Sequence, residues 1–461
     1  MTEDVFYKKI SLKDDTDYFL YVGEIKAYYL NEFLREALRK IHGKKVDFIA
    51  IVPDVLERYP QGNLLVINPE ASRLSRETGA RVSCRLPGRT FASIVSHHPA
   101  VIELVETLAE SQEKVWISMF HALAEMTLDR LPGVGILAPD SRVADRWNNK
   151  LYMYKTLQGH LPLPEFVLCG SRDELLEKTR RLWDTWRDGI FLSLEYSAAG
   201  IFSFIARDEA ELLEKLGDWS PPYLISRFVP HTHDPTVLAV VANERDVYIG
   251  GIADQRMEQL NKFRGSTAPS VLPREIQETL KNLTRKVGRL MGASGYRGIF
   301  GCDYIVKENG EVLFVEVNAR KQGTTMEMCC HLELSLDEDA PSLAELEYLA
   351  LTQGAFPAGL KEMEDNPNGI HWGTYNFKVE EDVFVHADLP WPDHERNIFR
   401  EVARNGTGAT HIVVEHIGKD FLLKAGAFLG RVIAVADSRE GVFEGLSEGE
   451  TALAATIRRE R

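Results

Sequence analysis

The chain has 461 residues, of which 44% are hydrophobic and 27% charged, an ordinary globular composition with room for roughly three domains. Its 54 Lys and Arg residues against 69 Asp and Glu residues give a formal net charge of −15, which excludes a general attraction for nucleic acid or anionic membranes. It shows no membrane-spanning apolar run and no secretory signal, and its five cysteines form neither a disulfide framework nor a CxxC zinc motif. We therefore expect a cytoplasmic protein without nucleic-acid or membrane partners.

The first 144 residues alternate strand and helix patterns. Apolar runs at 18–22 and 46–52 flank a segment, 30–41, whose apolar residues recur at helical spacing. This order predicts a right-handed parallel crossover, and 115–120 is predicted to be a later strand of the same sheet. The first turn offers only Gly23, so the G-x-G-x-x-G fingerprint of a dinucleotide site is absent.

Two turn-rich stretches predict domain boundaries, one near residues 139–140 and one from Pro357 to the Asp-Asn-Pro-Asn-Gly run at 365–369. We therefore divide the chain into domains at 1–144, 145–355 and 366–461. The last domain shows strand patterns at 373–379, 411–416 and 431–436 and a helix near its end, which predicts a small α+β domain.

The segment 273–325 carries the clearest chemistry. An amphipathic helix is predicted at 276–291, and strands at 299–306 and 311–318 flank Asn309-Gly310. An Asn-Gly pair between strands predicts a two-residue type I′ turn, in which both residues have positive φ. That turn places Asp303 opposite Glu316, with Asn318 further along the same face. The other face is apolar and pairs Cys302, Tyr304 and Val306 with Val317, Val315 and Leu313.

Two carboxylates at directly opposed positions repel each other, because their Cβ atoms are only about 4.5–5.5 Å apart. A cation would remove this repulsion, and a ligand set made only of oxygen atoms suits Mg²⁺. The alternative is a solvated outer face that carries two unrelated acids.

These residues resemble the metal-binding end of the ATP-grasp superfamily, which has an acid on one strand and an E-x-N-x-R segment on the next. The matching residues are Tyr296-Arg297-Gly298, Asp303 and the run Phe314-Val315-Glu316-Val317-Asn318-Ala319-Arg320. The resemblance implies that Asp303, Glu316 and Asn318 hold Mg²⁺ or Mn²⁺ on the phosphates of ATP. It places Arg320 beside the γ-phosphate.

Upstream segments resemble other parts of the same family. Residues 149–154 are similar to the opening of the ATP-grasp domain, which implies that Lys150 contacts nucleotide phosphate; the alternative is a solvated surface lysine. Residues 223–229 resemble the strand and hinge beside the adenine. The family's hinge usually carries a Glu where this chain has Ser226 or Arg227, so Ser226, Arg227 and Phe228 would contact adenine through their backbone.

The strand 191–195 departs most from the family, since the usual Lys-Pro pair is missing. The loop that follows would cover the phosphates with Ser197, Ala198, Ala199 and Gly200. Small residues let backbone N–H groups approach phosphate oxygens, but an ordinary turn is the alternative. What replaces the missing lysine is open.

Two further features are interpreted as structural rather than as metal-binding or catalytic. His231-Thr232-His233-Asp234 contains metal-ligand types but lies where a hinge loop is expected, with no matching group elsewhere. Cys329-Cys330 is predicted to be a pair of buried structural thiols rather than a nucleophile.

The resemblance implies an ATP-grasp fold, α/β and α+β, with an N-terminal Rossmann-like domain and a small C-terminal α+β domain, as in the peptide-ligase branch. It implies an ATP-dependent ligase that joins a carboxylate to an amine through an acylphosphate. Both substrates would be small molecules, with amino acids or peptides expected, and dimers are common in the superfamily. The alternatives are a kinase that phosphorylates a hydroxyl and a degenerate nucleotide-binding module.

Overall fold

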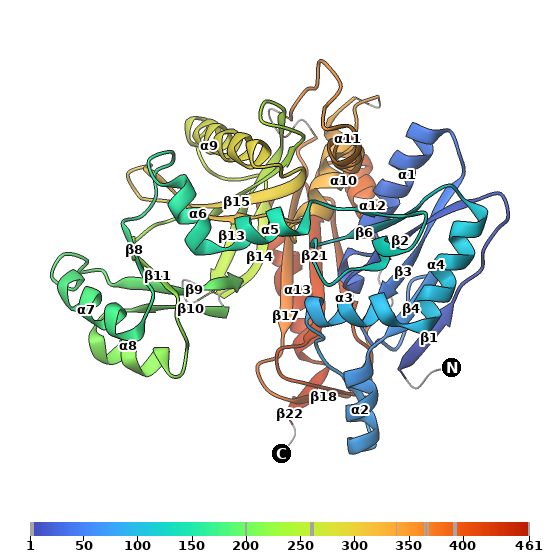
Figure 1. Ribbon diagram of the computed structural model, residues 1–461, viewed down its shortest axis with the longest axis horizontal. Helices are drawn as coiled ribbons and strands as arrows, with labels where there is room; N and C mark the ends of the chain where they lie inside the picture. Colours follow the sequence, from blue (N-terminus) through green and yellow to red (C-terminus); the bar gives the residue numbers. More distant parts are fainter. Residues whose placement is uncertain are drawn as a thin grey trace. The chain divides into compact units, whose positions relative to one another are not determined.

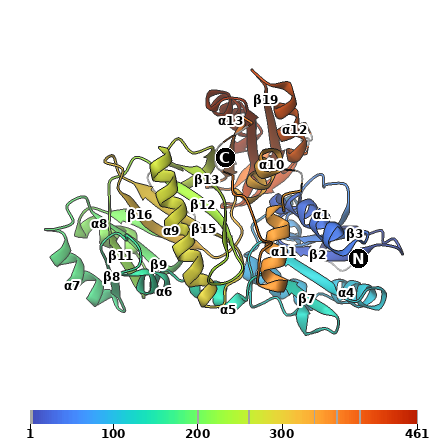
Figure 2. The same cartoon turned by 90° about the horizontal axis from the view of Figure 1, so that it is seen from above.

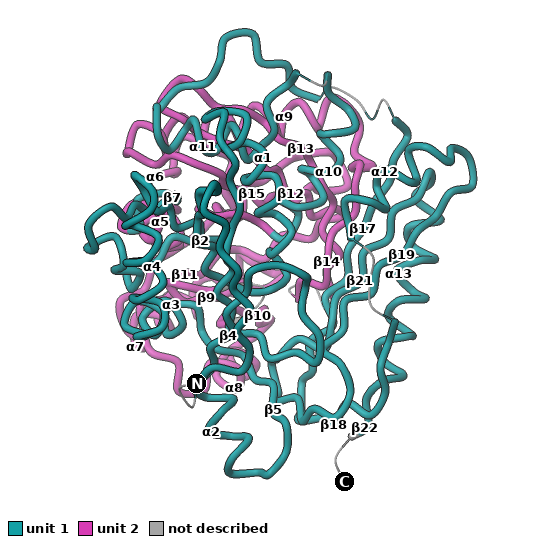
Figure 3. Tube along the Cα trace, turned by 90° about the vertical axis from the view of Figure 1, so that its right-hand side faces the viewer, with its two compact units in different colours: residues 1–141, 323–461 teal, residues 142–322 magenta. Residues whose placement is uncertain are grey.

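The computed structural model describes residues 4–198, 201–258, 262–337, 339–363, 366, 368–390 and 394–459. The chain folds into two compact units, shown in teal and magenta in Figure 3: unit 1 contains residues 1–141 and 323–461, and unit 2 contains residues 142–322. Residues 323–355, assigned by the predicted boundaries to the second domain, belong to unit 1; the three-domain division itself remains a prediction. Among the described residues, no helix is long and apolar enough to cross a bilayer.

The N-terminal part of unit 1 is built on a six-stranded sheet in the order β1-β4-β3-β2-β6-β7. Only β1 is antiparallel to its neighbour, so the predicted parallel crossover is confirmed. The strands are β1 (Val5–Lys9), β2 (Asp17–Val22), β3 (Val46–Val52), β4 (Asn63–Ile67), β6 (Val115–Met119) and β7 (Val134–Leu137). The helices are α1 (Leu30–His42), α2 (Pro69–Thr78), α3 (Gly88–His97) and α4 (Pro99–Ser111).

Helix α1 shows how the sequence pattern forms this layer. Its apolar residues at helical spacing, including Phe33, Leu34 and Leu38, are buried. The helix ends at Gly43, whose φ of 63° is the left-handed conformation that glycine adopts without strain. From β2 the chain runs outward to β3 and β4, and it returns to β6 and β7 on the other side of β2. The strand order therefore reverses beside the carboxyl end of β2.

The rest of unit 1 is antiparallel with helices. Strands β17 (His371–Lys378) and β19 (Thr410–His416) flank β21 (Phe428–Ala436), and α13 (Arg439–Ala454) packs on them. These elements confirm the strands and the helix predicted for the tail. A small sheet contains β22 (Ile457–Arg459), β18 (Val383–Val385), β20 (Phe421–Leu423) and β5 (Arg81–Ser83). The remaining helices are α10 (Thr325–Ser335), α11 (Leu343–Gln353) and α12 (Glu395–Asn405).

Unit 2 has two antiparallel sheets (Figure 1). The smaller, in the order β10-β9-β11-β8, shares its apolar core with α7 and α8. Its elements are β8 (Phe166–Cys169), α7 (Arg172–Leu182), β9 (Ile190–Ala198), β10 (Ile201–Ala206), α8 (Glu209–Leu216) and β11 (Tyr223–Arg227). Before them come α5 (Ser141–Asn148) and α6 (Lys150–Leu157).

The larger sheet of unit 2 has the order β16-β15-β12-β13-β14, and α9 lies along it (Figure 2). Its elements are β12 (Pro235–Val241), β13 (Val247–Glu258), β14 (Lys262–Ala268), α9 (Arg274–Ala293), β15 (Gly298–Val306) and β16 (Val312–Asn318). Helix α6 packs against β9 and β11 of the smaller sheet and against β16 of the larger one. Its first residue, Lys150, is therefore placed near both sheets.

The hairpin β15–β16 forms as predicted, but its turn does not. Gly310 has a φ of 82°, whereas Asn309 is not among the described residues with positive φ, so the type I′ turn is wrong. Val306 pairs with Val312 instead of Leu313, and the backbone N–H of Lys307 donates to the carbonyl of Glu311, so the turn contains three residues, 308–310, where two were predicted. Tyr304 pairs with Phe314 instead of Val315. A bulge after Asp303 then shifts the register back by one residue.

Candidate nucleotide and metal site

The hairpin places Asp303 and Glu316 directly opposite each other, and Asn318 donates from Nδ2 to Asp303 Oδ2 at 2.9 Å. The other carboxylate oxygen, Oδ1, accepts a hydrogen bond from Thr236 Oγ1 at 2.7 Å. Burial, and secondly the negative charge of Glu316, raise the pKa of Asp303 to about 6. The three predicted metal ligands therefore lie together, and Asp303 is held in place through both of its oxygens.

Lys150 supplies a cation to this pair. Its Nζ lies 3.0 Å from Glu316 Oε2, and its side chain is only 8% exposed, so the alternative of a solvated surface lysine is wrong. Asn149 caps helix α6 by accepting from the backbone N–H of Tyr152 at 3.0 Å, and it donates to Glu195 of β9. These bonds fix the end of the helix from which Lys150 reaches the hairpin.

Arg320 completes the group although strand β16 ends at Asn318. Its Nη2 donates to Asn318 Oδ1 at 2.8 Å, and its Nη1 donates to the carbonyl of Lys321 at 3.1 Å. Its positive charge also opposes the rise in the pKa of Asp303. The structure therefore brings together five of the predicted residues, namely Lys150, Asp303, Glu316, Asn318 and Arg320.

The donor set at the hairpin fits Mg²⁺. It consists of two opposed carboxylates and an amide oxygen, all hard oxygen donors. The repulsion between Asp303 and Glu316 and the ammonium of Lys150 beside them show that the position stabilises positive charge. Clusters of three or more His, Cys, Asp or Glu side chains suited to a metal do not occur among the described residues. An ion at this hairpin would therefore take its remaining ligands from water and phosphate.

The residues predicted to contact adenine lie at the end of β11. Ser226 is buried within the smaller sheet, and Arg227 forms an ion pair with Glu165 at 3.0 Å. The backbone N–H groups of Arg227 and Phe228 already donate to carbonyls, those of Glu165 and Gly189. Backbone N–H donation from these two residues to an adenine would therefore need these bonds to open.

The predicted phosphate loop is only partly described. Ser197 lies near the end of β9 and is partly buried, and β9 ends at Ala198. Ala199 and Gly200 lie outside the described residues. In the middle of β9, where the family's Lys-Pro pair is missing, Ser193 is completely buried and its Oγ has no hydrogen-bond partner among the described residues.

Two residues that support Asp303 were missed by sequence reasoning. Thr236 pairs with Asp303 across β12 and β15, and Gln322 donates from Nε2 to Thr236 Oγ1 at 2.9 Å. Gly301 makes room for this chain of hydrogen bonds, because a Cβ there would overlap the Gln322 side chain. Thr236 lies 67 residues before Asp303, so only the strand order could have revealed it.

The two simpler interpretations agree with the structure. His231 donates to the Val229 carbonyl at 2.7 Å and pairs with Asp234 at 2.9 Å, and this carboxylate raises the pKa of the imidazole against the effect of burial. Cys329 and Cys330 are buried and form no disulfide with a described cysteine, and burial raises the pKa of Cys330 well above its usual range.

The segment that forms this site matches a known family. Residues 147–324 match the model of the ATP-grasp domain. The chain carries an ATP-grasp domain. The match includes Lys150, the hairpin ligands and Arg320.

A curated relative is the [butirosin acyl-carrier protein]–L-glutamate ligase of Niallia circulans, 21% identical over 198 residues. The match covers 41% of this chain, and the chain spans 47% of that protein's length.

Solved structures share the fold over almost the whole chain. The N5-carboxyaminoimidazole ribonucleotide synthetase of Thermus thermophilus has a TM-score of 0.55 at 16% identity and covers 96% of this chain and 99% of its own. The biotin carboxylase domain of the Hydrogenobacter thermophilus 2-oxoglutarate carboxylase has a TM-score of 0.60 at 14% identity, and the match covers 95% of this chain and 90% of that domain's chain. The likeness confirms the predicted fold class and extends beyond the ATP-grasp segment.

Proposed function

We propose that the protein is an ATP-dependent ligase that joins a carboxylate to an amine through an acylphosphate. The observation that carries this proposal is the hairpin itself. Its opposed carboxylates, Asp303 and Glu316, lie beside the ammonium of Lys150 within a segment that matches the ATP-grasp domain. Such a group of oxygen ligands and cations suits a metal-bound polyphosphate.

The proposed reaction has two balanced steps. A carboxylate oxygen attacks the γ-phosphorus of ATP, the bond to the β,γ-bridging oxygen breaks, and ADP leaves. The amine nitrogen then attacks the acyl carbon, the C–N bond forms, and the bond from that carbon to the phosphate oxygen breaks. The ammonium loses two protons in all, one to the departing phosphate and one to water.

The residues at the site would act mainly by holding charge in place, since positioning and charge neutralisation supply most of the catalysis in phosphoryl transfer. Lys150 and Arg320 would bind phosphate oxygens, and Arg320 would stabilise charge on the γ-phosphoryl group. Mg²⁺ or Mn²⁺ held by Asp303, Glu316 and Asn318 would neutralise the phosphates when bound. Asp303 keeps its geometry through Thr236 and Asn318.

In this proposal, at least one of the two substrates is an amino acid or a peptide. The Niallia circulans relative is named as a ligase of L-glutamate and an acyl-carrier protein, and this name supports an amino acid as one substrate. Adenine contacts at Ser226, Arg227 and Phe228 and phosphate contacts in the 197–200 loop belong to the same proposal. A cytoplasmic location and a homodimer also remain predictions.

Calorimetric titration of Mg·ATP tests the nucleotide site. The wild type is expected to bind with micromolar affinity, and Glu316→Gln is expected to bind at least tenfold more weakly. Glu311→Gln is the matched control, because Glu311 lies on the same hairpin in a partly exposed pair with Lys307. If the wild type does not bind Mg·ATP, the site is a degenerate module and the ligase proposal is wrong.

Release of ADP in the presence of candidate carboxylates and amines tests the reaction. A ligase releases ADP only when both substrates are present and forms an amide that mass spectrometry detects. ADP release without an amine, together with a stable phosphate ester, would instead identify a hydroxyl kinase.

A further inference from the structure

Unit 1 contains a cavity of about 510 Å³ between the helices α1, α10 and α12 and the segment 340–342 that precedes α11. Helix α10 packs against both α1 and α12 (Figure 2). Pockets that hold drug-sized ligands have volumes of about 300–1,000 Å³. The apolar part of the lining includes Phe33, Ala37, Leu332, Leu336, Ala340 and Pro341. The cavity therefore has the room and the apolar wall that a small organic molecule needs.

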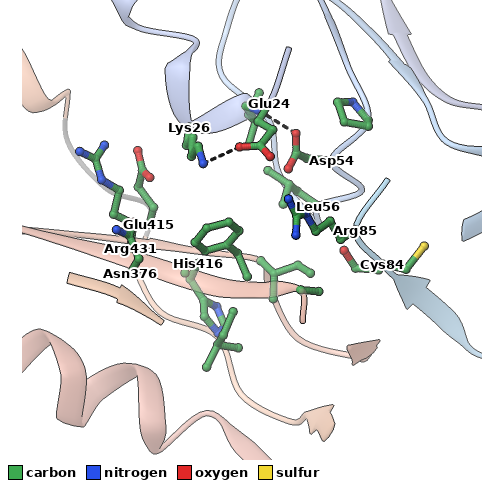
Figure 4. A pocket seen from close by; sticks show the side chains of 18 of the residues that line it. Glu24, Lys26, Asp54, Leu56, Cys84, Arg85, Asn376, Glu415, His416 and Arg431 are labelled. Carbon is green, nitrogen blue, oxygen red and sulfur yellow. Dashed lines mark hydrogen bonds and ion pairs between the residues drawn. The ribbon is translucent and has the colours of Figure 1, made fainter. Parts of the chain in front are cut away.

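A smaller cavity of unit 1, of about 140 Å³, has charges that are shared among its own residues (Figure 4). Glu24 pairs with Lys26 at 2.5 Å. Burial raises the pKa of Asp54 and of Glu415 to about 7, and the positive charge of Lys26 opposes the rise in both. These three acids therefore share one lysine, and their charges do not indicate a ligand.

The larger cavity has a charged wall that one buried arginine holds in place. Arg396 of α12 donates from Nε to Glu333 Oε2 at 2.8 Å and from Nη1 to Glu36 Oε1 at 2.6 Å, and its side chain is only 9% exposed. Its Cζ lies 4.5 Å from the centroid of the Phe33 ring. These contacts join α12 to α10 and to α1. They therefore fix the position of the following turns of α12 at the cavity.

Two further arginines on those turns are paired less completely. Arg400 and Arg404 follow Arg396 at spacings of four residues, so the three lie on one face of the helix, and all three line the cavity. Arg400 donates from Nη2 to Glu333 Oε1 at 2.7 Å, and its side chain is 38% exposed. The side chain of Arg404 is exposed and has no hydrogen bond or ion pair with a described residue. Two guanidinium groups with N–H donors to spare suit an oxyanion.

The acids at the cavity restrict which anion fits. Glu345 pairs with Lys40 of α1 at 3.1 Å, and Asp337 pairs with Lys361 at 3.1 Å. Glu36, which binds Arg396, keeps 46% of its side chain exposed. These carboxylates repel a dianion about twice as strongly as a monoanion, because the Coulomb energy is proportional to the charge. The cavity therefore favours a carboxylate with one negative charge over a phosphate monoester.

We propose that this cavity binds an organic monocarboxylate, with its carboxylate at Arg400 and Arg404 and its hydrocarbon body against the apolar wall. The charge-assisted hydrogen bonds would fix the orientation of the acid, and burial of the body would add affinity. All the lining residues belong to unit 1, whereas the hairpin ligands belong to unit 2. The proposal thus goes beyond the ligase function and does not require it.

Binding of 2-naphthoate to the full-length protein without nucleotide, measured by fluorescence and calorimetry, tests the cavity. The wild type is expected to bind 2-naphthoate saturably. It is expected to bind the uncharged 2-naphthamide, and acetate, which lacks the body, about tenfold more weakly or less. Arg400→Gln and Arg404→Gln are each expected to weaken 2-naphthoate binding by about tenfold, since each removes a charged donor. Arg130→Gln, at an exposed arginine outside the cavity, is the matched control and is expected to bind as the wild type does.

Ala403→Trp keeps the test valid if the arginine variants fold poorly. Ala403 is exposed and lines the cavity, so an indole ring there would occupy the space of the hydrocarbon body without removing a charge. This variant is expected to keep the Tm of the wild type and to lose 2-naphthoate binding. A folded Ala403→Trp variant that binds as the wild type does would overturn the location.

Three other results would overturn the proposal. Equal binding of 2-naphthoate and 2-naphthamide by the wild type would remove the role of the arginines. Tighter binding of 2-naphthyl phosphate than of 2-naphthoate would identify a phosphate site in place of a carboxylate site. Failure of a folded wild type to bind 2-naphthoate would overturn the site itself.

Failure of the ligase proposal has a different signature. If the wild type binds 2-naphthoate as expected but does not bind Mg·ATP, the cavity stands and the ligase proposal is wrong. If the wild type binds Mg·ATP and forms an amide but does not bind 2-naphthoate, the ligase stands and the cavity assignment is wrong.

Discussion

Replacement of Lys150 by Met tests whether the hairpin is a cation site. Lys150 and Glu316 form a largely desolvated ion pair, with side chains 8% and 20% exposed. Removal of one partner from a buried pair costs about 3–5 kcal/mol, and we expect the lower end, about 3 kcal/mol, because Glu316 keeps some contact with water. For a unit of this size, that loss lowers Tm by about 6–12 °C.

Free Mg²⁺ is expected to reverse part of this loss. Without the ammonium, the repulsion between Asp303 and Glu316 is offset less, since Arg320 remains but Lys150 does not, so Mg²⁺ at about 100 times its Kd would return about 2.7 kcal/mol to the variant. The wild type is expected to gain less, because Lys150 competes with the ion for Glu316. Whereas free Mg²⁺ is expected to stabilise the variant more than the wild type, Mg·ATP is expected to bind the variant more weakly, since Lys150 would no longer hold phosphate.

Differential scanning calorimetry with and without Mg²⁺ measures both effects. Lys155→Met is the control, because Lys155 is an exposed lysine on the same helix. Equal Mg²⁺-induced shifts in Tm for Lys150→Met and the wild type would refute the reasoning, and so would a Tm for Lys150→Met that matches the control.

Two further predictions concern buried contacts. Gly301→Ala is expected to displace Gln322 and to weaken Mg·ATP binding by about tenfold in calorimetry, whereas Gly323→Ala, where a Cβ meets no atom within 4 Å, is expected to bind normally. His331 is 1% exposed, its Nδ1 accepts from Trp372 Nε1 at 3.2 Å, and burial lowers the pKa of its imidazole to about 4. The unfolded chain binds a proton at His331 near pH 6.5, whereas the folded chain binds it near pH 4. The contribution of neutral His331 to the free energy of unfolding is therefore complete above pH 6.5 and falls by about 1.4 kcal/mol per pH unit towards pH 4. Burial also lowers the pKa of His416 to about 4, so both proteins are expected to lose stability as the pH falls. In urea unfolding, the slope of the wild type is expected to exceed that of His331→Asn by about 1.4 kcal/mol per pH unit, and equal slopes would contradict the prediction.

The sequence predicted the hairpin β15–β16 and the pairing of Asp303 with Glu316, but the turn type from which that pairing was derived is wrong. The Asn-Gly pair indicated a tight connection, and the apolar alternation indicated the two strands. The turn holds an extra residue, and the bulge after Asp303 compensates for it, so Asp303 and Glu316 face each other as expected. A bulge has no clear sequence signal, because it depends on how the neighbouring strands pack.

Contacts between distant segments were beyond sequence reasoning. Lys150 was identified from its local motif, but its burial and its pairing with Glu316 require the packing of α6 on β16. The Thr236–Gln322 support for Asp303 likewise depends on the order of strands in the sheet. Periodicity reports which face of an element is apolar, and it does not report which element covers that face.

The small sheet of unit 1 has a consequence for protein synthesis. Strand β5 pairs in parallel with β20, and Arg81 lies opposite Phe421. At about 5–20 residues per second, β5 emerges from the ribosome tens of seconds before its partner strand exists. Unit 2, which is continuous in the chain, is completed within that interval. We therefore expect unit 2 to fold before β5 pairs with β20. During this interval β5 is an unpaired strand that a chaperone can protect. A premature stop before β20 would leave this strand exposed.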